Sequence, residues 1–245
     1  MSKKVIFNLI FGLILILNQA NAQTFIESGR IVYERKTNLQ KIPNLPSWMQ
    51  KQVDELKYKV EKFELLFDKE QSAFLPIDVP NATPSMLDYL TVKNKVYASS
   101  KTSERMTVID LMGTKIFLKD TANQREWIIT ENTRNIAGFN CRMAVNPVND
   151  STRLYAWYAL ELIPTVGPET FFGLPGAILG LATEDGGVVY FAKSVEVLTP
   201  DPKKFDLAIG KSDVVSIAKF KDDMTKRMGN NPMAKDMLKG FFRWY

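Results

Sequence analysis

The 245-residue chain contains no histidine and one cysteine, and each of these shortages excludes a class of site. The absence of histidine excludes Ser-His-Asp and Cys-His nucleophilic sites, metal centres with histidine ligands and histidine proton relays. Because Cys141 stands alone, no disulfide forms within the chain. The P-loop, GxSxG and dinucleotide-binding patterns are absent as well. Any catalysis would therefore rest on carboxylates, lysine, tyrosine or a Ser-Lys pair.

Long runs of one charge are also missing, since no stretch of five or more like charges occurs and the formal net charge is +5. Nucleic-acid binding needs a clustered basic stripe, so nucleic acid is excluded as a partner. Aspartates spaced for calcium are absent, and 184–187 (EDGG) predicts a tight hairpin turn instead, because Asp-Gly and Gly-Gly tolerate positive φ. The sequence thus indicates neither a metal nor an organic cofactor.

The only long apolar run lies near the N-terminus, at 5–17. Its 13 residues fall short of the roughly 20 that span a bilayer as a helix. The run follows two lysines and precedes small residues at 20–22 (ANA), which predicts a signal peptide at 1–22 with cleavage after Ala22. No cysteine lies near this point, which excludes lipoprotein processing, and no later segment approaches transmembrane length.

We therefore expect a soluble exported protein that begins at Gln23 and is periplasmic or associated with the outer membrane. Removal of 1–22 takes away two lysines and leaves 30 basic and 27 acidic side chains, a net charge of +3. The remaining 223 residues fit one β-rich domain at 23–245, and a hydrophobic content of 45% suffices for a sizeable core.

Alternating apolar and polar residues recur in short segments about 10 residues apart, which is typical of an antiparallel sheet that packs or curls on itself. The predicted strands are 29–35, 59–68, 72–77, 96–100, 105–110, 115–118, 127–130, 139–145, 154–159 and 188–197. The predicted helical segments are 46–57, one turn near Met86 in the loop 78–94, and 212–228 and 232–244 within a C-terminal extension of about 205–245. The expected fold is mainly β (α+β): a curved antiparallel sheet, or an open barrel or sandwich, with an early helix and C-terminal helices.

Two groups of sulfur-containing side chains have both a packing and a metal interpretation. Cys141 shares one face of its alternating segment with Phe139 and Met143, which favours a buried core thiol over a metal ligand or redox partner, since no second soft ligand is near. In the tail, methionines recur at roughly helical spacing, which suits copper(I) ligation or, as we favour, packing between a helix and a curved sheet. They are Met224, Met228, Met233 and Met237.

The most distinctive segment is 153–181 (RLYAWYALELIPTVGPETFFGLPGAILGL), where an aromatic strand pattern leads into turns rich in proline and glycine and then an apolar run. Together with 29–34 (GRIVYE), 127–130 (WIIT) and 138–141 (GFNC), it resembles the GLPGLI family of small exported proteins of Bacteroidota-type bacteria. The Gly-Leu-Pro-Gly motif of that family occurs here at 173–176. The resemblance implies export and a shared architecture, but no reaction, because the family has no established biochemical function.

The segment between Ala159 and Ala177 is long for a hairpin, and three prolines and three glycines restrict its backbone. Two roles suit such a loop: it closes the core at one end of the sheet, or it forms the preorganised lip of a ligand cleft. For the second role, the candidate ligand- or partner-binding residues are Trp157, Glu161, Glu169, Phe172, Gly173, Leu174, Pro175 and Gly176. No residue is assigned as catalytic or metal-binding.

Three functional hypotheses follow. In the first, the protein is a non-enzymatic binding or accessory module whose curved sheet holds an apolar ligand, lipid or peptide. In the second, it docks on an outer-membrane transport or secretion partner through an exposed sheet edge or its aromatic C-terminus. In the third, it is an enzyme with a carboxylate-based site.

Overall fold

The structure is a computed structural model that describes residues 25–42, 45, 47–78, 80, 86–111, 113–121, 125–149, 152–210 and 212–228. The predicted signal peptide and the predicted helix at 232–244 lie outside the described residues, as do Met233 and Met237. Within the described ranges, no helix combines the length and the apolar character needed to cross a membrane.

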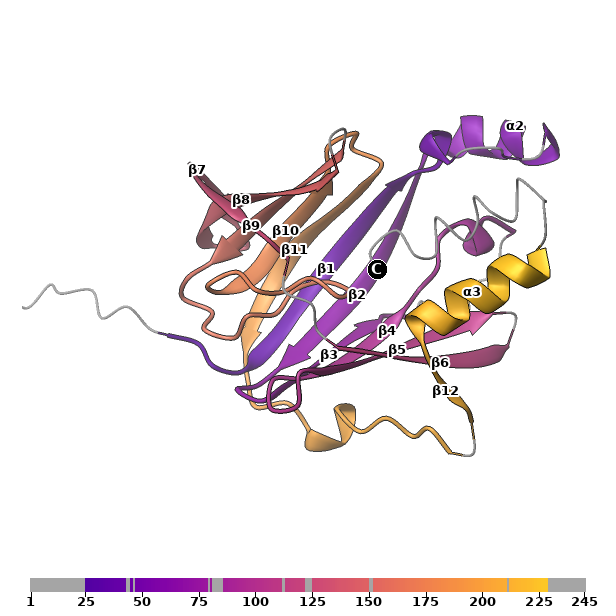
Figure 1. The fold of residues 1–245 in the computed structure, drawn as a ribbon. Helices are drawn as coiled ribbons and strands as arrows, with labels where there is room; N and C mark the ends of the chain where they lie inside the picture. The colour runs from indigo at the N-terminus through magenta and orange to yellow at the C-terminus, as the bar shows by residue number, and fades with distance from the viewer. Residues whose placement is uncertain are drawn as a thin grey trace, which may run out of the picture.

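One sheet of twelve strands contains all the named strands of the described residues, in the order β12-β6-β5-β4-β3-β2-β1-β11-β10-β9-β8-β7. Their bounds are β1 (Gly29–Asn38), β2 (Tyr58–Phe67), β3 (Gln71–Pro76), β4 (Lys95–Ser99), β5 (Glu104–Leu111), β6 (Thr114–Thr121), β7 (Ile128–Ile136), β8 (Phe139–Asn149), β9 (Thr152–Ala159), β10 (Ala177–Thr183), β11 (Val188–Val197) and β12 (Val214–Ser216). Neighbouring strands are antiparallel, except that β12 runs parallel to β6. The mainly β class and the open, curved antiparallel sheet are therefore confirmed (Figure 1).

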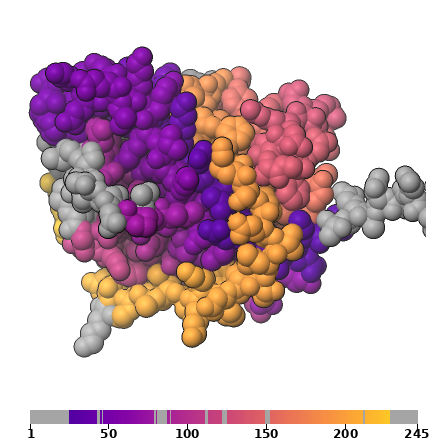
Figure 2. Space-filling view, turned by 180° about the vertical axis from the view of Figure 1, so that it is seen from behind, coloured from indigo at the N-terminus to yellow at the C-terminus, as the bar shows by residue number. Residues whose placement is uncertain are grey.

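The sheet bends along β1 and β2, which cross the middle of the molecule (Figure 1). These two strands pair from Gly29↔Phe67 to Asn38↔Tyr58 without a shift in register. Strands β3–β6 lie on one side of this central pair and β7–β11 lie on the other. Both halves of the sheet bend toward the same side, so that this face of the sheet is concave (Figure 1). Figure 2 shows the molecule from behind, where the chain after β11 runs along the lower edge through η3 (Pro202–Lys204).

The main core lies on the concave side and includes aromatic rings from both halves of the sheet. The rings of Phe63 and Phe74 stack with centroids 4.9 Å apart. Tyr33 and Tyr190 each approach Phe74 edge-on, with centroids at 6.2 Å. Because one cluster joins β3 to β11, the curvature of the sheet follows from burial of these large side chains.

The early helix forms where the sequence predicts it, as α2 (Ser47–Leu56). Its buried Met49 and Val53 pack with Leu39 of η1 (Leu39–Lys41) and with Leu87 of η2 (Met86–Leu90), which is the predicted turn near Met86. Leu56, one turn after Val53, is exposed, because the helix ends at this residue.

Three parts of the sheet differ from the prediction, the first being β7, which was predicted at 127–130 but continues to Ile136. The run 212–228 was expected to be helical throughout, but Val214 and Val215 pair with Phe117 and Leu118 as β12, and α3 (Ile217–Met228) begins only after them. Adjacent β-branched residues favour the extended conformation, which explains the difference. The strand β10 was not among the predicted strands, because it is buried on both faces and its apolar run has no alternation.

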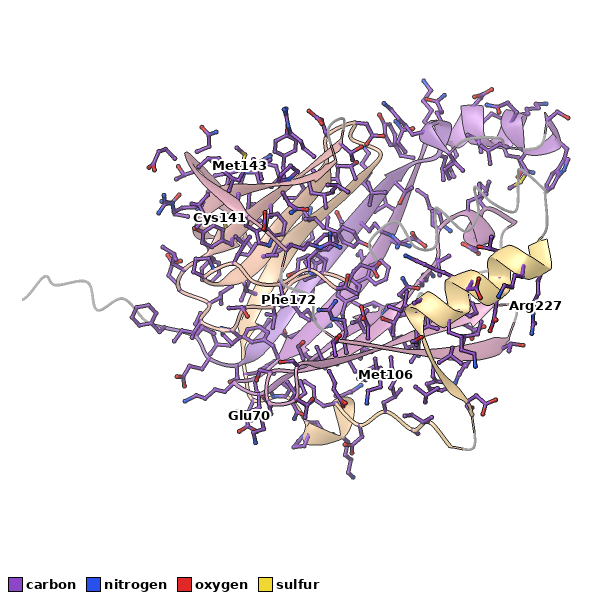
Figure 3. The ribbon with its side chains drawn as sticks, viewed as in Figure 1. Glu70, Met106, Cys141, Met143, Phe172 and Arg227 are labelled. Atoms are coloured by element: carbon purple, nitrogen blue, oxygen red, sulfur yellow. The ribbon has the colours of Figure 1, made fainter. Side chains whose placement is uncertain are left out.

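The sulfur-containing side chains that the structure describes are placed by packing. Cys141 is fully buried in the core, as predicted, and burial together with nearby Glu161 raises its pKa to about 12. Met143, labelled with Cys141 in Figure 3, is only half-buried, and Ala144 joins the core instead. Met224 of α3 packs against the small cluster that contains Ile109 of β5.

Candidate functional site

The loop 160–176, which we call the signature loop, joins β9 to β10 and crosses the concave side of the sheet (Figure 1). Its Leu162, Phe171 and Leu174 belong to the main core. Backbone bonds hold its ends, from Ala177 N to Leu162 O at 3.0 Å and from Ile178 N to Val166 O at 2.8 Å. The loop is therefore part of the core, which agrees with the first of its two predicted roles.

Two glycines of the motif have positive backbone φ angles, which residues with a Cβ rarely adopt. Gly173 has φ of 92° and Gly176 has φ of 141°. A Cβ added at Gly176 would lie 2.1 Å from the carbonyl oxygen of Ala159, closer than any van der Waals contact allows. The loop therefore needs glycine at 176 both for its backbone angle and for the close approach of β9.

Glu169 belongs to the signature loop, but its side chain is buried in the interior of the protein. The Tyr190 hydroxyl donates to its Oε1 at 2.7 Å, and Asn94 Nδ2 donates to its Oε2 at 3.1 Å. Arg35 Nη1 reaches Oε1 at 3.5 Å. Its backbone φ of 54° is in the left-handed region, which is rare for a residue other than glycine. Such a conformation costs free energy and persists only where the surrounding structure holds it, as the side-chain contacts of Glu169 do here.

The sheet register brings the partners of Glu169 together. On the concave face, Arg35 of β1 stands directly between Tyr190 of β11 and Glu61 of β2. Arg35 donates to Glu61 Oε2 from Nη2 at 2.7 Å and from Nε at 3.1 Å, and its Nη1 donates to Val92 O at 2.8 Å. Its guanidinium also lies 4.7 Å above the Phe63 ring. One buried cation thus contacts two buried carboxyl groups.

The pKa values in this cluster follow from burial and from the neighbouring charges. Burial raises the pKa of Glu169, and the opposing effects of Arg35, Tyr190 and Asn94 do not cancel it. Burial, and then the charge of Glu169, place the pKa of Tyr190 well above its usual value. Burial alone would lower the pKa of Arg35, but Tyr190, Glu61 and Glu169 outweigh it and keep the guanidinium charged.

The aromatic pair 171–172 ties the signature loop to both halves of the sheet. The carbonyl of Phe172 accepts a hydrogen bond from Trp127 Nε1 at 3.0 Å, and its ring lies 4.7 Å under the guanidinium of Arg105 on β5. The guanidinium of Arg125 covers the Phe171 ring at 4.7 Å. Figure 3 shows Phe172 between the two halves of the molecule.

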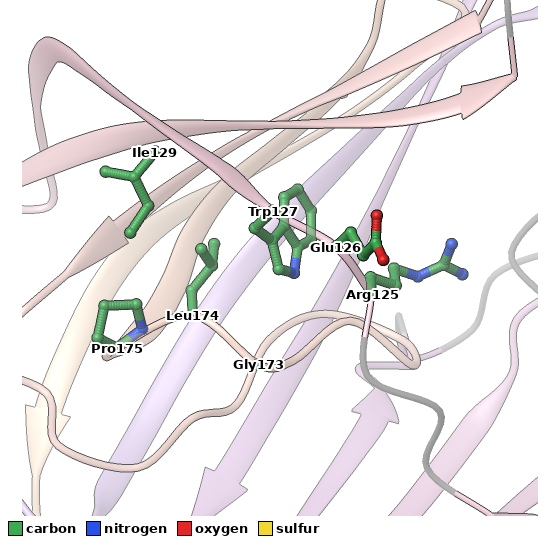
Figure 4. Close-up of a pocket in the computed structure, with 7 residues that line it drawn as sticks. All are labelled: Arg125, Glu126, Trp127, Ile129, Gly173, Leu174 and Pro175. Carbon is green, nitrogen blue, oxygen red and sulfur yellow. The ribbon is translucent and has the colours of Figure 1, made fainter.

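A groove of about 420 Å³ opens between the motif and the segment that leads into β7, the edge strand. Its lining residues are Arg125, Glu126, Trp127, Ile129, Gly173, Leu174 and Pro175 (Figure 4). Three of the candidate residues are therefore brought together here. The lining residues between 125 and 129 are not among the binding residues predicted from the sequence. The one signal for them is that 127–130 forms part of the resemblance to the GLPGLI family.

The remaining candidates lie elsewhere. Trp157 points to the face opposite to that of its core neighbour Tyr158 and stacks on Phe191, with centroids 6.1 Å apart. Glu161 accepts from Ile26 N through its backbone carbonyl at 2.8 Å, and its carboxyl group lies near Cys141. Phe172 is half-buried at the rim described above.

The described part of the chain contains no group of three or more Cys, Asp or Glu side chains arranged to hold a metal ion. What the site offers chemically is apolar side chains, an indole, one cation and one carboxylate around a surface groove, and the same loop carries the buried Glu169.

Comparison of the chain with protein-family models and with curated proteins finds no match. Among solved structures, the fold is similar to that of PNGF-II in a C2 crystal form, with a TM-score of 0.54 and 16% identity, and in a P21 form, with a TM-score of 0.52 and 16% identity. Each match covers 80% of this chain and 32% of the PNGF-II chain, so this chain spans about a third of that protein. At this identity the similarity concerns the fold alone.

Proposed function

We propose that this protein is an exported, non-enzymatic binding module of the GLPGLI type, periplasmic or associated with the outer membrane, that holds an apolar ligand in the groove. The observation that carries the proposal is the construction of the groove wall. Gly173, Leu174 and Pro175 are held by a loop that is anchored in the core, and Trp127 faces them from the edge of the sheet. A concave site that combines apolar side chains with a few placed polar groups, here Arg125 and Glu126, is typical of small-ligand binding.

The chemistry of the wall favours a ligand that is mainly apolar with one charged or polar end. Pro175 and Ile129 offer aliphatic surface, and the half-buried Trp127 offers an aromatic one, while Leu174 anchors the wall in the core. Arg125 and Glu126 stand at the same groove and would orient a polar end. A lipid chain with its headgroup, or an apolar peptide segment, has this character.

A second candidate function, docking on an outer-membrane partner, is favoured by the open edge at β7. Ile128 and Ile129 are both exposed at this edge, by 60% and 45%, and Val148 on β8 adds a third exposed apolar side chain. The start of β7 is apolar, whereas Glu131 and Arg134 lie further along the strand, so a strand from another chain would pair at the start of this edge.

Two neighbouring variants separate these functions. Ile129→Asp places a charge in the groove, whereas Ile128→Asp places the same charge on the same edge but outside the groove. Native mass spectrometry after gentle extraction from cells should show a bound small molecule or peptide on the wild type and on Ile128→Asp, and none on Ile129→Asp. Loss of a stoichiometric protein partner in both variants would support edge docking instead. Absence of any bound mass on the wild type would contradict the binding function.

A further inference from the structure

Four large apolar side chains are exposed where the early helix leads into β2, and we call this group the α2 tip. They are Trp48 and Leu56 on α2, exposed by 59% and 51%, and Tyr58 and Val60 on β2, exposed by 43% and 56%. Only Lys57 separates the helix from the strand. Because a helix of this length spans about 15 Å, the four side chains belong to one region of the surface.

The α2 tip projects from the sheet, since α2 lies beyond the ends of β1 and β2 (Figure 1). The helix is held there by the buried Met49 and Val53, which pack with η1 and η2. Trp48 and Leu56 lie along one i, i+4 ridge of the helix and take no part in that packing. The exposed side chains of the tip are therefore not needed to fix the helix in place.

The charge around the α2 tip is positive. The ammonium group of Lys36 on β1 lies 3.9 Å above the ring of Tyr58. Three more exposed lysines lie in the same stretch of chain, and none has an ion pair within the described ranges: Lys41, Lys51 and Lys57. The exposed acids of this stretch are Asp54 and Glu55, so four basic and two acidic side chains leave a net charge of +2. The remaining cation, Lys59, pairs with Asp88 at 2.6 Å.

We propose that the α2 tip docks the protein reversibly on a bilayer surface that carries anionic phospholipid. Trp48 and Tyr58 each combine an apolar body with a polar end, the property that enriches these residue types at the boundary of a membrane. The surplus lysines add attraction to anionic headgroups. The helix is too short to cross the bilayer and would lie in the headgroup region.

The size and shape of the tip favour a lipid surface over a protein partner. A stable protein interface takes about 20 or more residues from each side. The α2 tip offers four large apolar side chains on a projecting end, which suits insertion between headgroups. The proposal is independent of the ligand in the groove. The strand β7, beside the groove, lies on the other side of the molecule from α2, so docking through the tip leaves the groove open (Figure 1).

Sedimentation of the full exported protein with vesicles tests the docking. The probes are phosphatidylcholine vesicles with and without phosphatidylglycerol. The wild type should bind the vesicles with phosphatidylglycerol more tightly, and added salt should weaken this binding. The double variant Trp48→Ser/Tyr58→Ser should bind at least about tenfold more weakly, because it loses both aromatic contacts with the bilayer. Ile128→Ser on β7 is the matched control, since it removes an apolar side chain exposed by 60% and should bind like the wild type.

The contribution of charge is tested by a second pair of variants. Lys41→Gln/Lys51→Gln should lower the affinity for the phosphatidylglycerol vesicles at least about tenfold and leave the weak binding to phosphatidylcholine unchanged. Lys203→Gln/Lys204→Gln removes the same charge from the exposed η3 and should have a much smaller effect. Circular dichroism checks that all variants are folded.

The position of Trp48 in the bilayer gives an independent measurement. Brominated phospholipid in the vesicles should quench part of the tryptophan fluorescence of the wild type, and Trp48→Phe should lose that part while it still binds. Failure of the wild type to bind either vesicle would overturn the proposal. So would equal binding of the wild type and Trp48→Ser/Tyr58→Ser, or an equal loss of binding in Ile128→Ser. None of these outcomes bears on the groove, whose ligand is tested by Ile129→Asp.

Discussion

Arg35 Nη1 lies 3.5 Å from Glu169 Oε1, and this contact joins the central strand β1 to the signature loop 134 residues later in the chain. The same guanidinium holds Glu61 on the neighbouring strand β2. The position of the loop and the pairing of the central strands are therefore coupled through one buried side chain.

Removal of this cation should be costly. We expect Arg35→Met to lower the free energy of unfolding by about 3–5 kcal/mol, because two carboxyl groups lose their partner while they stay buried. Arg30→Met on the same strand is the matched control, since Arg30 pairs with Glu64 and Glu196 at a partly exposed site and should cost less than about 1 kcal/mol. Urea denaturation followed by circular dichroism measures both values. Equal losses of unfolding free energy in the two variants would show that the buried ion pairs of Arg35 stabilise the protein no more than the partly exposed pairs of Arg30.

The stability of the protein should also depend on pH through Glu169. Its raised pKa means that its contribution is fully present below the pKa of the unfolded chain and is lost as the pH rises through the folded pKa. Relative to Glu169→Gln, the wild type should therefore lose stability with rising pH, by at most about 1.4 kcal/mol per pH unit. Urea midpoints of the two proteins across the pH range give this difference in stability. A difference that does not change with pH would show that the pKa of Glu169 is not raised in the folded protein.

The motif glycine Gly176 should be far less tolerant than an ordinary turn glycine. Gly176→Ala sets a Cβ against Ala159 O, and we expect a loss of at least about 3 kcal/mol from the clash and the backbone strain. Gly186→Ala is the control, because Gly186 also has positive φ, at 66°, but no atom within 4 Å of the added Cβ. It should cost about 1 kcal/mol. Thermal melts of the pair give the comparison, and similar melting temperatures would mean that the loop can move away from β9.

The adjacent phenylalanines should differ in their effect on stability. Phe171 is fully buried in the core, so Phe171→Ala should cost about 3–5 kcal/mol. Phe172 is half-buried and loses mainly its contact with Arg105, so Phe172→Ala should cost about 1–2 kcal/mol. Urea denaturation measures both changes. A larger loss for Phe172 would place it, not Phe171, as the anchor of the loop.

The alternation of the sequence was sufficient to predict most of the sheet. In β1, the buried Ile31 and Tyr33 alternate with the less buried Val32 and Glu34, and the strand forms as expected. The limits of the signature loop, Ala159 and Ala177, were also predicted, because prolines and glycines recur between them from Pro164 to Gly176. Alternation fails for β10, where both faces are buried and no polar residue marks a period.

The buried cluster could not be predicted, because its members come from separate strands and meet only through the register. Arg35, Glu61, Asn94, Glu169 and Tyr190 have no common spacing in the sequence. One signal was present: Arg35 falls on the inward face of β1, two residues after Tyr33, where a charged side chain needs a buried partner. Glu169 was a candidate for the lip of a cleft, but the structure buries it, because its exposure depends on how the loop folds back, which local sequence does not determine.

The central claim, that a ligand occupies the groove beside the motif, is tested most directly by the indole signal of Trp127. Its Nε1–H donates to Phe172 O at 3.0 Å at the edge of the groove, whereas Trp157 lies on the opposite face of the sheet and serves as an internal control. The measurement is an NMR spectrum of protein with isotope-labelled tryptophan, recorded as extracted from cells and again after an organic solvent wash and refolding. We expect the Trp127 indole resonance to shift on removal of the ligand while that of Trp157 stays in place. Identical Trp127 positions in the two samples, with bound ligand confirmed by mass in the first, would contradict the claim.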